Sequence, residues 1–383
     1  MEGLREFLIE REEKGLLRKL RPADLRYEGK IYFKGREYYD FSSNDYLGLS
    51  SHPLLKETAK EAIERFGVSS CASRLLSGDN EIFHRLEKKT AKFKGKESAL
   101  VFNCGYQANV GIISALFKKG DCIFSDRLNH ASIVDATLLS GAKLFRFKHN
   151  DAGDLKIILE RERKNFRNAL IVTESVFSMD GDQAPLKELV SLKKKYDCRI
   201  MVDEAHATGV FGKKGSGLVE EEGLSREIDL IMGTFSKALG SFGAYLAASK
   251  DVTDYLVNTC RSFIYSTALP VSIIAANLAA LELIGLEPQR RQTLLSLAQL
   301  LRDKLKKKGL EVKGSSQIVP VILGDNFRAL EFAKRLQDKG FWVMAVRPPT
   351  VPGKEARLRI SLNYHNNDKV LNKLIDAITE IKI

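Results

Sequence analysis

Short apolar runs alternate with segments of helical periodicity through the first two thirds of the chain. The runs have the length of strands, and the segments between them, such as 105–117, 132–140 and 186–196, place apolar residues three or four positions apart. This alternation predicts an α/β fold in which helices cover both faces of a mostly parallel sheet. The predicted strands are 99–102, 122–124, 143–147, 169–173, 200–202, 230–232 and 244–248.

The pattern changes after about residue 286. Longer helix-period segments and strand-length runs follow there, and their order predicts a smaller α+β domain. We therefore divide the chain into an N-terminal segment (1–48), a large domain (49–286) and a small C-terminal domain (287–383). The elements expected in the small domain are helices 290–308, 326–339 and 368–381 and strands 317–323, 341–346 and 356–362.

Polar residues of the kind used in catalysis follow several of the predicted strands. Asp126, Glu174, Asp203 and Lys237 each come at or just after the end of an apolar run, and Asn103–Tyr106 follows another. The carboxyl ends of parallel strands meet at one edge of a sheet, where open α/β folds bind their ligands. The sequence therefore predicts one cleft lined by these residues.

Lys237 and Asp203 are the most informative of these positions. A lysine amine can bond to the aldehyde of pyridoxal 5'-phosphate (PLP), and a carboxylate can keep the pyridine nitrogen protonated. His206 lies three residues beyond Asp203, close enough to contact another edge of the same ring. A lysine after a strand is more often a solvated loop residue. Asp203 with His206 would also suit a metal, but no further ligand has suitable spacing, so no metal site is predicted.

A phosphate site is predicted beside this pair. Gly105 and Tyr106 begin a helix directly after a strand, and backbone N–H groups at a helix N-terminus bind anions. Thr234 and Ser236 flank the lysine turn and offer hydroxyl groups to the same phosphate. His130 can stack on a planar ring, although a single histidine in a loop is more often solvated.

Two arginines near the C-terminus share one face of a predicted strand. Arg357 and Arg359 alternate with Leu358 and Ile360, so both guanidinium groups point to the same side. Such a group binds the carboxylate of an amino acid through paired hydrogen bonds. The spacing leaves open which arginine has this role, and we expect the other to be structural.

Composition narrows the class of protein. The 383 residues are 44% hydrophobic and 29% charged, as in ordinary globular proteins, and the five cysteines form no Cys-x-x-Cys pair. This cysteine pattern predicts neither a disulfide framework nor a zinc site and favours a reducing, cytoplasmic environment. The apolar run 271–286 is too short to span a bilayer and the N-terminus does not resemble a signal peptide, so no membrane association is predicted.

The net charge of +12 has two interpretations. Most lysines lie on helix-period segments and are expected to face water, but a positive surface also attracts a polyanionic substrate such as a coenzyme A (CoA) thioester. No nucleic-acid partner is predicted, because the sequence has no basic arm with interleaved aromatic residues. A catalytically inactive, basic protein on the same scaffold is the alternative, and it would bind nucleic acid in a salt-dependent way.

Six segments, in order, resemble the α-oxoamine synthases, which are PLP-dependent enzymes that condense an amino acid with an acyl thioester. The resemblance covers nearly the whole chain. It implies the PLP-dependent transferase fold of type I, with a large domain around a mostly parallel sheet and a smaller α+β C-terminal domain, and a homodimeric acyltransferase. The segments are Phe41–Leu49, Asp126–Ser132, Thr173–Asp182, Val202–Gly209, Thr234–Gly240 and Ile264–Pro270.

The resemblance also implies a role for each matching residue. Lys237 would hold PLP, Asp203 would pair with its ring nitrogen, His130 would stack on the ring and His206 would contact the phenolic oxygen. Arg18, expected in the N-terminal helix, matches a position near the acyl substrate. Beside the cofactor the family implies Gly105, Tyr106, Glu174, Ser178, Thr234 and Thr267, the last reaching the phosphate of a second subunit, and around the amino-acid carboxylate it implies Asn44, Arg359 and nearby Thr350.

Within the family, Val346–Pro352 followed by Ala356–Arg359 most resembles the member of the biotin pathway. Its substrates would be L-alanine and a pimeloyl thioester, either pimeloyl-CoA or pimeloyl-acyl carrier protein. Glycine with acetyl-CoA is the alternative substrate pair. Amino-group transfer is a further alternative, because one fold supports several reactions.

The chain departs from the family at two places. Val68–Leu75 lacks glycines that relatives usually have, and the added side chains either narrow the acyl channel or stiffen a loop. Cys104 stands where serine is common, and we assign it no phosphate contact because a thiol is a poor hydrogen-bond donor.

Overall fold

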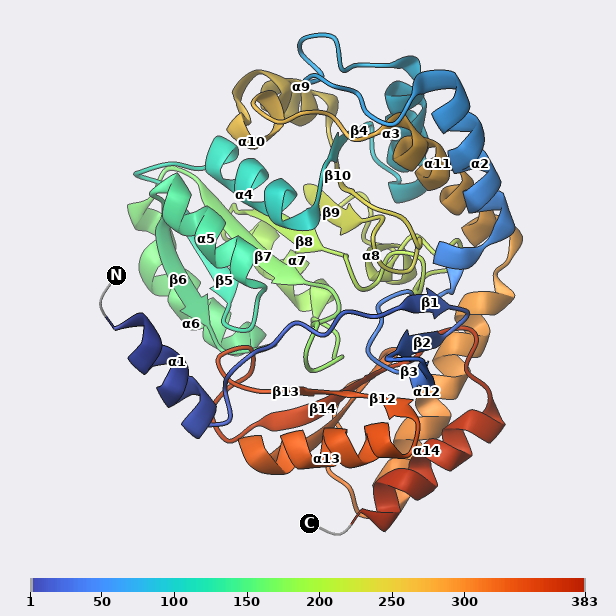
Figure 1. Ribbon diagram of the computed structural model, residues 1–383. Coiled ribbons are helices and arrows are strands. Elements are labelled where there is room, and N and C mark those ends of the chain that lie inside the picture. Colours follow the sequence, from blue (N-terminus) through green and yellow to red (C-terminus); the bar gives the residue numbers. More distant parts are fainter. Residues whose placement is uncertain (1–2, 382–383) are drawn as a thin grey trace. The chain divides into compact units, whose positions relative to one another are not determined.

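The computed structural model describes residues 3–381, which form two compact units (Figure 1). One unit contains the N-terminal residues to Gly48, the short segment Ser178–Asp182 and the C-terminal residues from Gln292. The other contains Leu49–Phe177 and Gln183–Arg291. The N-terminal residues, which we treated as a separate segment, therefore fold with the C-terminal region.

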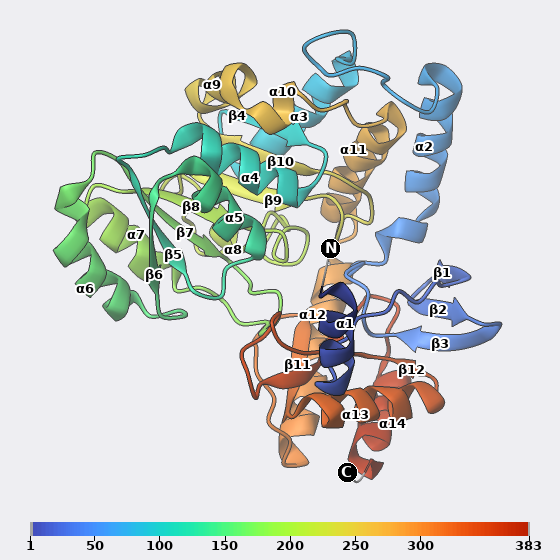
Figure 2. The same ribbon diagram turned by 60° about the vertical axis from the view of Figure 1, so that its left-hand side comes forward.

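The larger unit is built on a seven-stranded sheet with the order β4-β10-β9-β8-β7-β5-β6 (Figure 2). Only β10 runs against its neighbours, so the expectation of a mostly parallel sheet is confirmed. Each strand matches an apolar run of the sequence, because both faces of such a sheet are covered. The strands are β4 (Ser98–Phe102), β5 (Cys122–Asp126), β6 (Lys143–Phe147), β7 (Ala169–Glu174), β8 (Arg199–Asp203), β9 (Leu230–Thr234) and β10 (Ala244–Ala248).

Helices cover both faces of this sheet. The helices α4, α5, α9 and α10 bury side chains such as Ile112, Ala136 and Leu256 in one core with the strands. The helix α3 packs on β4 and β10, and α7 packs on β8. Figure 2 shows α4 and α5 on one side of the strands β5 and β6 and α6 and α7 on the other. The helix α11 is largely buried, as its apolar sequence predicted. The helices are α2 (Pro53–Phe66), α3 (Glu81–Lys94), α4 (Gly105–Leu116), α5 (Ala131–Ser140), α6 (Ala152–Glu162), α7 (Leu186–Lys195), α8 (Leu218–Glu221), α9 (Lys250–Thr259), α10 (Arg261–Ile264) and α11 (Val271–Leu286), with short 3-10 helices at Leu49–Ser51 and Arg163–Asn165.

The smaller unit contains two sheets and four longer helices. One sheet has the order β11-β14-β13, and the other has the order β1-β2-β3-β12, in which β12 pairs in parallel with β3. That pairing joins the N-terminal strands to the C-terminal region. The elements are α1 (Leu4–Glu13), β1 (Leu25–Tyr27), β2 (Lys30–Phe33), β3 (Arg36–Asp40), α12 (Gln289–Lys307), β11 (Ile318–Gly324), α13 (Asn326–Asp338), β12 (Phe341–Trp342), β13 (Met344–Val346), β14 (Ala356–Ser361) and α14 (Asp368–Glu380).

Two expectations about this unit were wrong. The run 341–346 is not one strand, because β12 and β13 belong to different sheets and the chain passes from one to the other at the buried Val343. Arg18 does not lie in a helix, because α1 ends at Glu13 and Gly15 adopts a left-handed φ of +63°, which stops the helix.

The loop that lacks the family's glycines is held by hydrogen bonds. Cys71 adopts φ of +55°, a left-handed conformation that glycine reaches with less strain. Ser70 Oγ donates to the Leu269 carbonyl at 2.7 Å, and the Ala268 N–H donates to the Ala72 carbonyl at 2.9 Å. These bonds support the interpretation that the added side chains accompany a stiffened loop.

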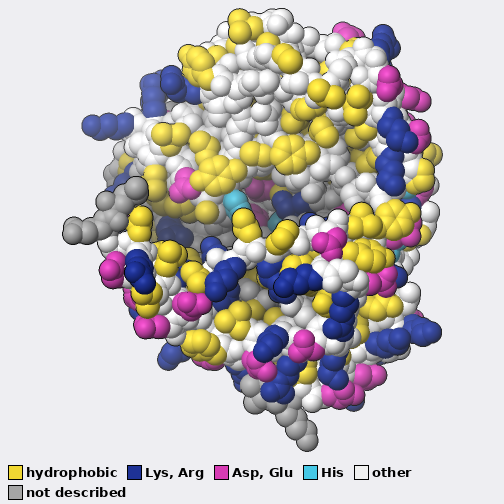
Figure 3. Space-filling model, viewed as in Figure 1, with side chains coloured by type: hydrophobic (Ala, Val, Ile, Leu, Met, Phe, Trp, Pro, Cys, Tyr) yellow, Lys and Arg dark blue, Asp and Glu magenta, His cyan; other side chains and the backbone are white. Residues whose placement is uncertain are grey.

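The positive charge is dispersed on the face shown in Figure 3, where Lys and Arg side chains are interspersed with Asp and Glu. A few lysines pair with carboxylates one turn away, as Lys250 does with Asp254 at 2.6 Å. This distribution fits the interpretation of a solvated lysine-rich surface.

Within residues 3–381, no single helix combines the length and the apolar composition that crossing a membrane requires. One bent pair, α11 with α12, meets both criteria by length and composition alone.

Candidate active site

Asp203 and Glu174 lie side by side at the carboxyl ends of neighbouring parallel strands. They are paired in register between β7 and β8, and the next strand, β9, leads into the turn that carries Lys237. The Gly240 N–H closes this turn by donating to the Lys237 carbonyl at 2.9 Å, and a Cβ on Gly240 would lie only 2.3 Å from the Ser50 nitrogen. Lys237 is half-buried and interacts electrostatically with Glu174. The structure thus brings the amine and both carboxyl groups together.

The buried Asp203 carboxylate is oriented by uncharged donors. Asn109 Nδ2 donates to one of its oxygens at 3.0 Å, and the Ala205 N–H donates to the other at 2.9 Å. Both hydrogen bonds fix the direction of the carboxylate. His206 is buried in the turn that follows, with 6% of its surface exposed.

The carboxyl group of Glu174 has a strongly raised pKa. Burial raises the pKa of the Glu174 carboxyl group from 4.5 to about 8, and the nearby Asp203 charge adds to this increase. The His130 N–H, which donates to Glu174 at 2.7 Å, and the Lys237 ammonium both oppose it. At neutral pH Glu174 therefore keeps its proton for most of the time.

His130 is fixed at the start of α5, where its side chain caps the helix. Its Nδ1 lies 2.8 Å from Ser132 Oγ, which in turn accepts a hydrogen bond from Asn109 Nδ2 at 3.0 Å. Because Asn109 also donates to Asp203, one amide connects the His130 ring to the buried carboxylate. Tyr106 lies edge to face against the ring, with centroids 6.4 Å apart.

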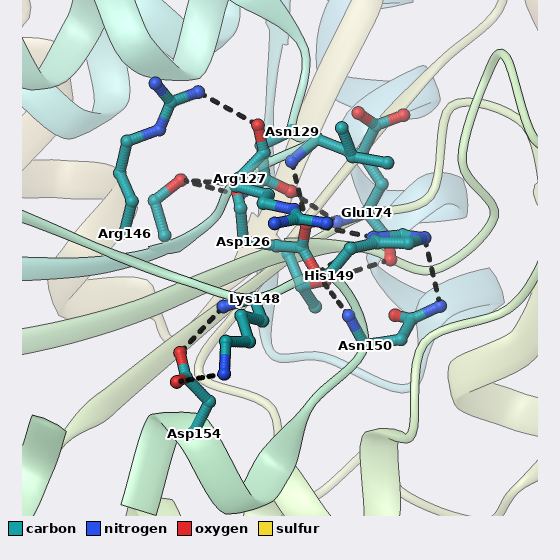
Figure 4. Close-up of polar contacts among 12 residues, drawn as sticks. Asp126, Arg127, Asn129, Arg146, Lys148, His149, Asn150, Asp154 and Glu174 are labelled. Carbon is teal, nitrogen blue, oxygen red and sulfur yellow. Dashed lines mark hydrogen bonds and ion pairs between the residues drawn. The ribbon is translucent and has the colours of Figure 1, made fainter. Parts of the chain in front are cut away.

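A polar network supports the loop that carries His130 (Figure 4). Asp126, expected to line the cleft, instead lies beneath the loop, with one carboxylate oxygen 3.0 Å from His149 Nδ1. Asn129 accepts the Glu174 N–H at 3.1 Å and so ties the loop to the end of β7. Asp126 therefore supports the site from below.

Asn109, Ser132 and Asn129 were not predicted from the sequence as site residues. Asn109 is 1% exposed and is the only amide on the buried side of α4, whose other buried residues are Ala108, Gly111, Ile112 and Ile113. A buried side-chain amide needs hydrogen-bond partners. An amide on the apolar face of a helix that begins at a predicted phosphate site was therefore a usable signal.

The residues at the start of α4 fit a phosphate group. A Cβ on Gly105 would lie 3.0 Å from Thr234 Cγ2, so glycine permits the close approach of α4 and β9. Thr234 Oγ1 is buried and has no hydrogen-bond partner in the described part of the chain. Ser236 is exposed nearby and adds a second hydroxyl donor. Thr267 is exposed as well, and its backbone carbonyl is held by a hydrogen bond from Asn103 Nδ2 at 2.9 Å. These donors fit the phosphate of PLP, and the amine and carboxylate described above fit its aldehyde and ring nitrogen.

The two arginines of β14 have different surroundings in the smaller unit. Arg357 is fully buried, and its guanidinium pairs with Asp180 at 2.8 Å and with Glu355 at 2.7 Å. Two carboxylates therefore satisfy Arg357, which makes it the structural member of the pair.

Arg359 is also buried but has neutral partners. It donates to the Ser178 carbonyl at 2.6 Å, to Ser361 Oγ at 2.6 Å and to Asn44 Oδ1 at 3.2 Å. No carboxylate among residues 3–381 lies within ion-pairing distance of Arg359. The structure thus joins Asn44, Ser178 and Arg359 in one group around a positive charge that lacks a counterion.

Arg18 belongs to a second group of arginines in the smaller unit. It donates to Thr350 Oγ1 at 2.7 Å, while Arg347 and Arg11 donate to backbone carbonyls of the loop after α1. Burial lowers the pKa of Arg347, and the charges of Arg18 and Arg11 lower it further. In the described chain none of the three arginines pairs with a carboxylate, so this group favours an anion.

Comparisons with known proteins agree with this geometry. The family model for aminotransferase class I and II matches residues 36–378. The chain is 48% identical over 370 residues to 8-amino-7-oxononanoate synthase of Geotalea daltonii, covering 96% of this chain and 94% of that protein. It is 49% identical over 370 residues to the protein of that name from Geobacter metallireducens, with the same coverage.

Solved structures with the same fold include two kinds of enzyme. Serine palmitoyltransferase from S. paucimobilis with bound PLP–myriocin has a TM-score of 0.93 and 31% identity, covering 99% of this chain and 96% of that one. The 8-amino-7-oxononanoate synthase from Francisella tularensis has a TM-score of 0.78 and 30% identity, covering 90% and 97% of the two chains.

Proposed function

Because the chain belongs to the aminotransferase class I and II family, we propose that it catalyses the PLP-dependent condensation of L-alanine with a pimeloyl thioester, the reaction of 8-amino-7-oxononanoate synthase. Relatives with that name are 46–49% identical over 96% of the chain. The structural observation that carries the proposal is the group of Lys237, Asp203 and Glu174 at three adjacent strand ends.

The amine and the ionised carboxylate would divide the chemistry between them. PLP, when bound, supplies a ring that withdraws electrons from the α-carbon of the amino acid. Lys237 would hold the aldehyde and, once displaced by the substrate, would remove the α-proton. Asp203 would keep the ring nitrogen protonated, and the hydrogen bond from Asn109 would hold its carboxylate in place.

Glu174 would act as a neutral neighbour in this arrangement. A protonated Glu174 does not compete with Asp203 for the positive charge of the ring nitrogen. Its position at the end of β7 and its coupling to Lys237 would keep a proton beside the catalytic amine. His130 would cover one face of the PLP ring, because its backbone N–H is hydrogen-bonded to Glu174 and fixes its position.

Arg359 would bind the carboxylate of L-alanine. Its guanidinium is buried and held only by neutral oxygens, so a substrate carboxylate would supply the missing counterion. Asn44 would orient the same group, because its amide oxygen already contacts Arg359 at 3.2 Å.

The acyl substrate would meet Arg18 and Thr350. Together with Arg347 and Arg11, these residues form a group in which no arginine is ion-paired with a carboxylate of the described residues. An acyl chain that ends in a carboxylate, as a pimeloyl chain does, matches this charge. The phosphates of CoA and of an acyl carrier protein match it as well, and both carriers belong to the proposal.

We further propose that the enzyme is a homodimer. The exposed Thr267 would reach the phosphate bound by the second subunit, as the resemblance to the family implies. Light scattering coupled to size-exclusion chromatography should give twice the mass of one chain, which is 42.9 kDa. A monomer with full activity would contradict this part of the proposal.

One steady-state assay tests the proposed reaction. Thiol release would be followed with L-alanine and pimeloyl-CoA, with L-alanine and pimeloyl-acyl carrier protein, and with glycine and acetyl-CoA. We expect turnover with alanine and at least one pimeloyl carrier, and a kcat/KM at least tenfold lower for glycine with acetyl-CoA. Preference for the glycine pair, or amino-group transfer to a 2-oxo acid without thiol release, would overturn the proposal.

A further inference from the structure

A hollow of about 650 Å³ lies at the edge of the large sheet opposite to the candidate active site. It is lined by residues at the start of β8 (Arg199), the start of β9 (Leu230) and the end of β10 (Ala248), whereas Asp203 and Thr234 lie at the other ends of these strands. The volume falls in the range of small-molecule sites, which is roughly 300–1,000 Å³.

Two cations of the hollow, Lys96 and Arg226, form no ion pair with a carboxylate of the described residues. Lys96 is half-buried, and its ammonium donates to the backbone carbonyl of Ile228. Burial lowers the pKa of Lys96, and the neighbouring Lys193 lowers it further, while Asp229, Glu97 and Glu227 oppose this. Arg226, also in the lining, makes no hydrogen bond or ion pair with any residue that the structure describes.

The acidic residues of the lining are already occupied or stand at the rim. Asp229 pairs with Lys193 at 2.8 Å and accepts the Ile200 N–H at 2.7 Å. Glu97 accepts the Lys250 N–H at 3.1 Å, and Asp251 is exposed in the first turn of α9, where the helix dipole stabilises a negative charge. Arg199, also in the lining, pairs with Asp229 at 3.4 Å, so Lys96 and Arg226 are the two cations left to contact a ligand. The exposed Glu97 and Asp251 disfavour a polyanion, and a single carboxylate is the anion that these two cations suit.

The rest of the lining is apolar. Phe117 and Leu230 are buried, and Leu116, Ile228 and Val252 extend the same surface. Binding of an apolar ligand that displaces water from such a surface is favourable. We propose that the hollow binds a monocarboxylate with an aliphatic body, in the class of medium-chain fatty acids, with its carboxylate at Lys96 and Arg226 and its chain along Phe117 and Leu230.

Calorimetric titration of the PLP-loaded enzyme with octanoate tests this site. We expect one octanoate per chain, and we expect no binding of octylamine, which carries the wrong charge, or of acetate, which lacks the apolar body. Lys96→Met should weaken octanoate binding at least tenfold and Val252→Trp should abolish it by filling the hollow. Lys96→Arg, which keeps the charge, should retain binding, and Lys88→Met, an exposed lysine of α3 outside the lining, is the matched control.

Octanoate could also occupy the acyl-substrate region, and the variants separate the two sites. Binding there would survive Lys96→Met and Val252→Trp and would be lost when the acyl thioester is present, which would overturn the proposal. The proposal is independent of the proposed reaction, because the variants should keep the visible absorbance of bound PLP and the melting temperature of the parent. Loss of either in Lys96→Met alone leaves Val252→Trp and Lys96→Arg to decide the outcome.

Discussion

Asp203 and Glu204 are adjacent and both buried, but they have different partners. Glu204 pairs with the Lys94 ammonium at 2.8 Å, and its other oxygen accepts the Val219 N–H at 2.9 Å. Lys94, which is 1% exposed, also donates to Thr208 Oγ1 at 3.0 Å. Asp203 is held instead by an amide and a backbone N–H.

The difference shows how one strand end serves both stability and chemistry. A buried ion pair whose polar atoms are all bonded fixes the backbone but has no capacity left for a ligand. A carboxylate held by neutral donors keeps its negative charge available. Arg357 and Arg359 repeat the contrast in the smaller unit, since the first meets two carboxylates and the second only neutral oxygens.

The largest effect of a substitution should be on turnover, at the group of Asp203 and Lys237. Lys237→Ala should lower turnover by about 10⁴-fold, the upper range for losing a proton-transfer group, and should abolish the visible absorbance of lysine-bound PLP. The urea unfolding curve should change little, because Lys237 is half-buried in a turn. Retained absorbance would show that another lysine holds the cofactor.

Substitutions in the buried ion pair of Lys94 and Glu204 should change the free energy of unfolding. Lys94→Met should lower the free energy of unfolding by about 3–5 kcal/mol, because it leaves the buried Glu204 charge without a partner. Lys94→Met combined with Glu204→Gln should recover part of the loss, since the uncompensated charge is gone. Urea denaturation measures both variants. A loss below about 1 kcal/mol in the single variant would show that this network is not the stabilising element.

Glu174 should make the stability of the protein depend on pH. The folded pKa of about 8 lies above the unfolded value near 4.5, so the folded protein holds an extra proton between these pH values and loses stability as pH rises through them. Glu174→Gln removes this loss. Its advantage in unfolding free energy over the parent should therefore grow by a few kcal/mol from pH 5 to pH 8. A pH-independent difference would contradict the raised pKa.

Substitution of Arg359 should have the smallest of these effects, and it should differ clearly from substitution of Arg357. Arg359→Lys should raise the KM for L-alanine about 30-fold, equivalent to about 2 kcal/mol for a charge-assisted hydrogen bond. Arg357→Lys is the matched control, and it should lower stability while leaving this KM unchanged. Similar KM values in both variants would remove Arg359 from the carboxylate site.

Much of the larger unit could be predicted from the sequence because its strands are buried on both sides. The runs 143–147 and 244–248 coincide with β6 and β10. Every position of β10 is buried, whereas β6 lies at the edge of the sheet and carries the exposed Lys143 and Arg146. The run 341–346 was equally apolar, but hydrophobicity does not report which sheet a residue joins. The helical period near the N-terminus predicts a helix that includes Arg18, but the left-handed Gly15 ends the helix before that residue.

The chemistry of single side chains was less predictable. Alternation along β14 could not distinguish Arg357 from Arg359, because their partners Asp180 and Ser178 come from a segment far away in the sequence. Lys94 looks like a solvated lysine at a helix end, and only Glu204, 110 positions further along the chain, makes its burial possible. Partners at such separations leave no local signal.

The reversed strand β10 has a consequence for how the protein is made. It lies between β4 and β9, so the helix start at Gly105 reaches Thr234 only after residues 244–248 have inserted between the two strands. Pairings between residues so distant in sequence form late in folding. A nascent chain released before residue 248 would carry Lys237, Asp203 and Glu174 yet be unable to retain PLP, the vitamin B6 cofactor.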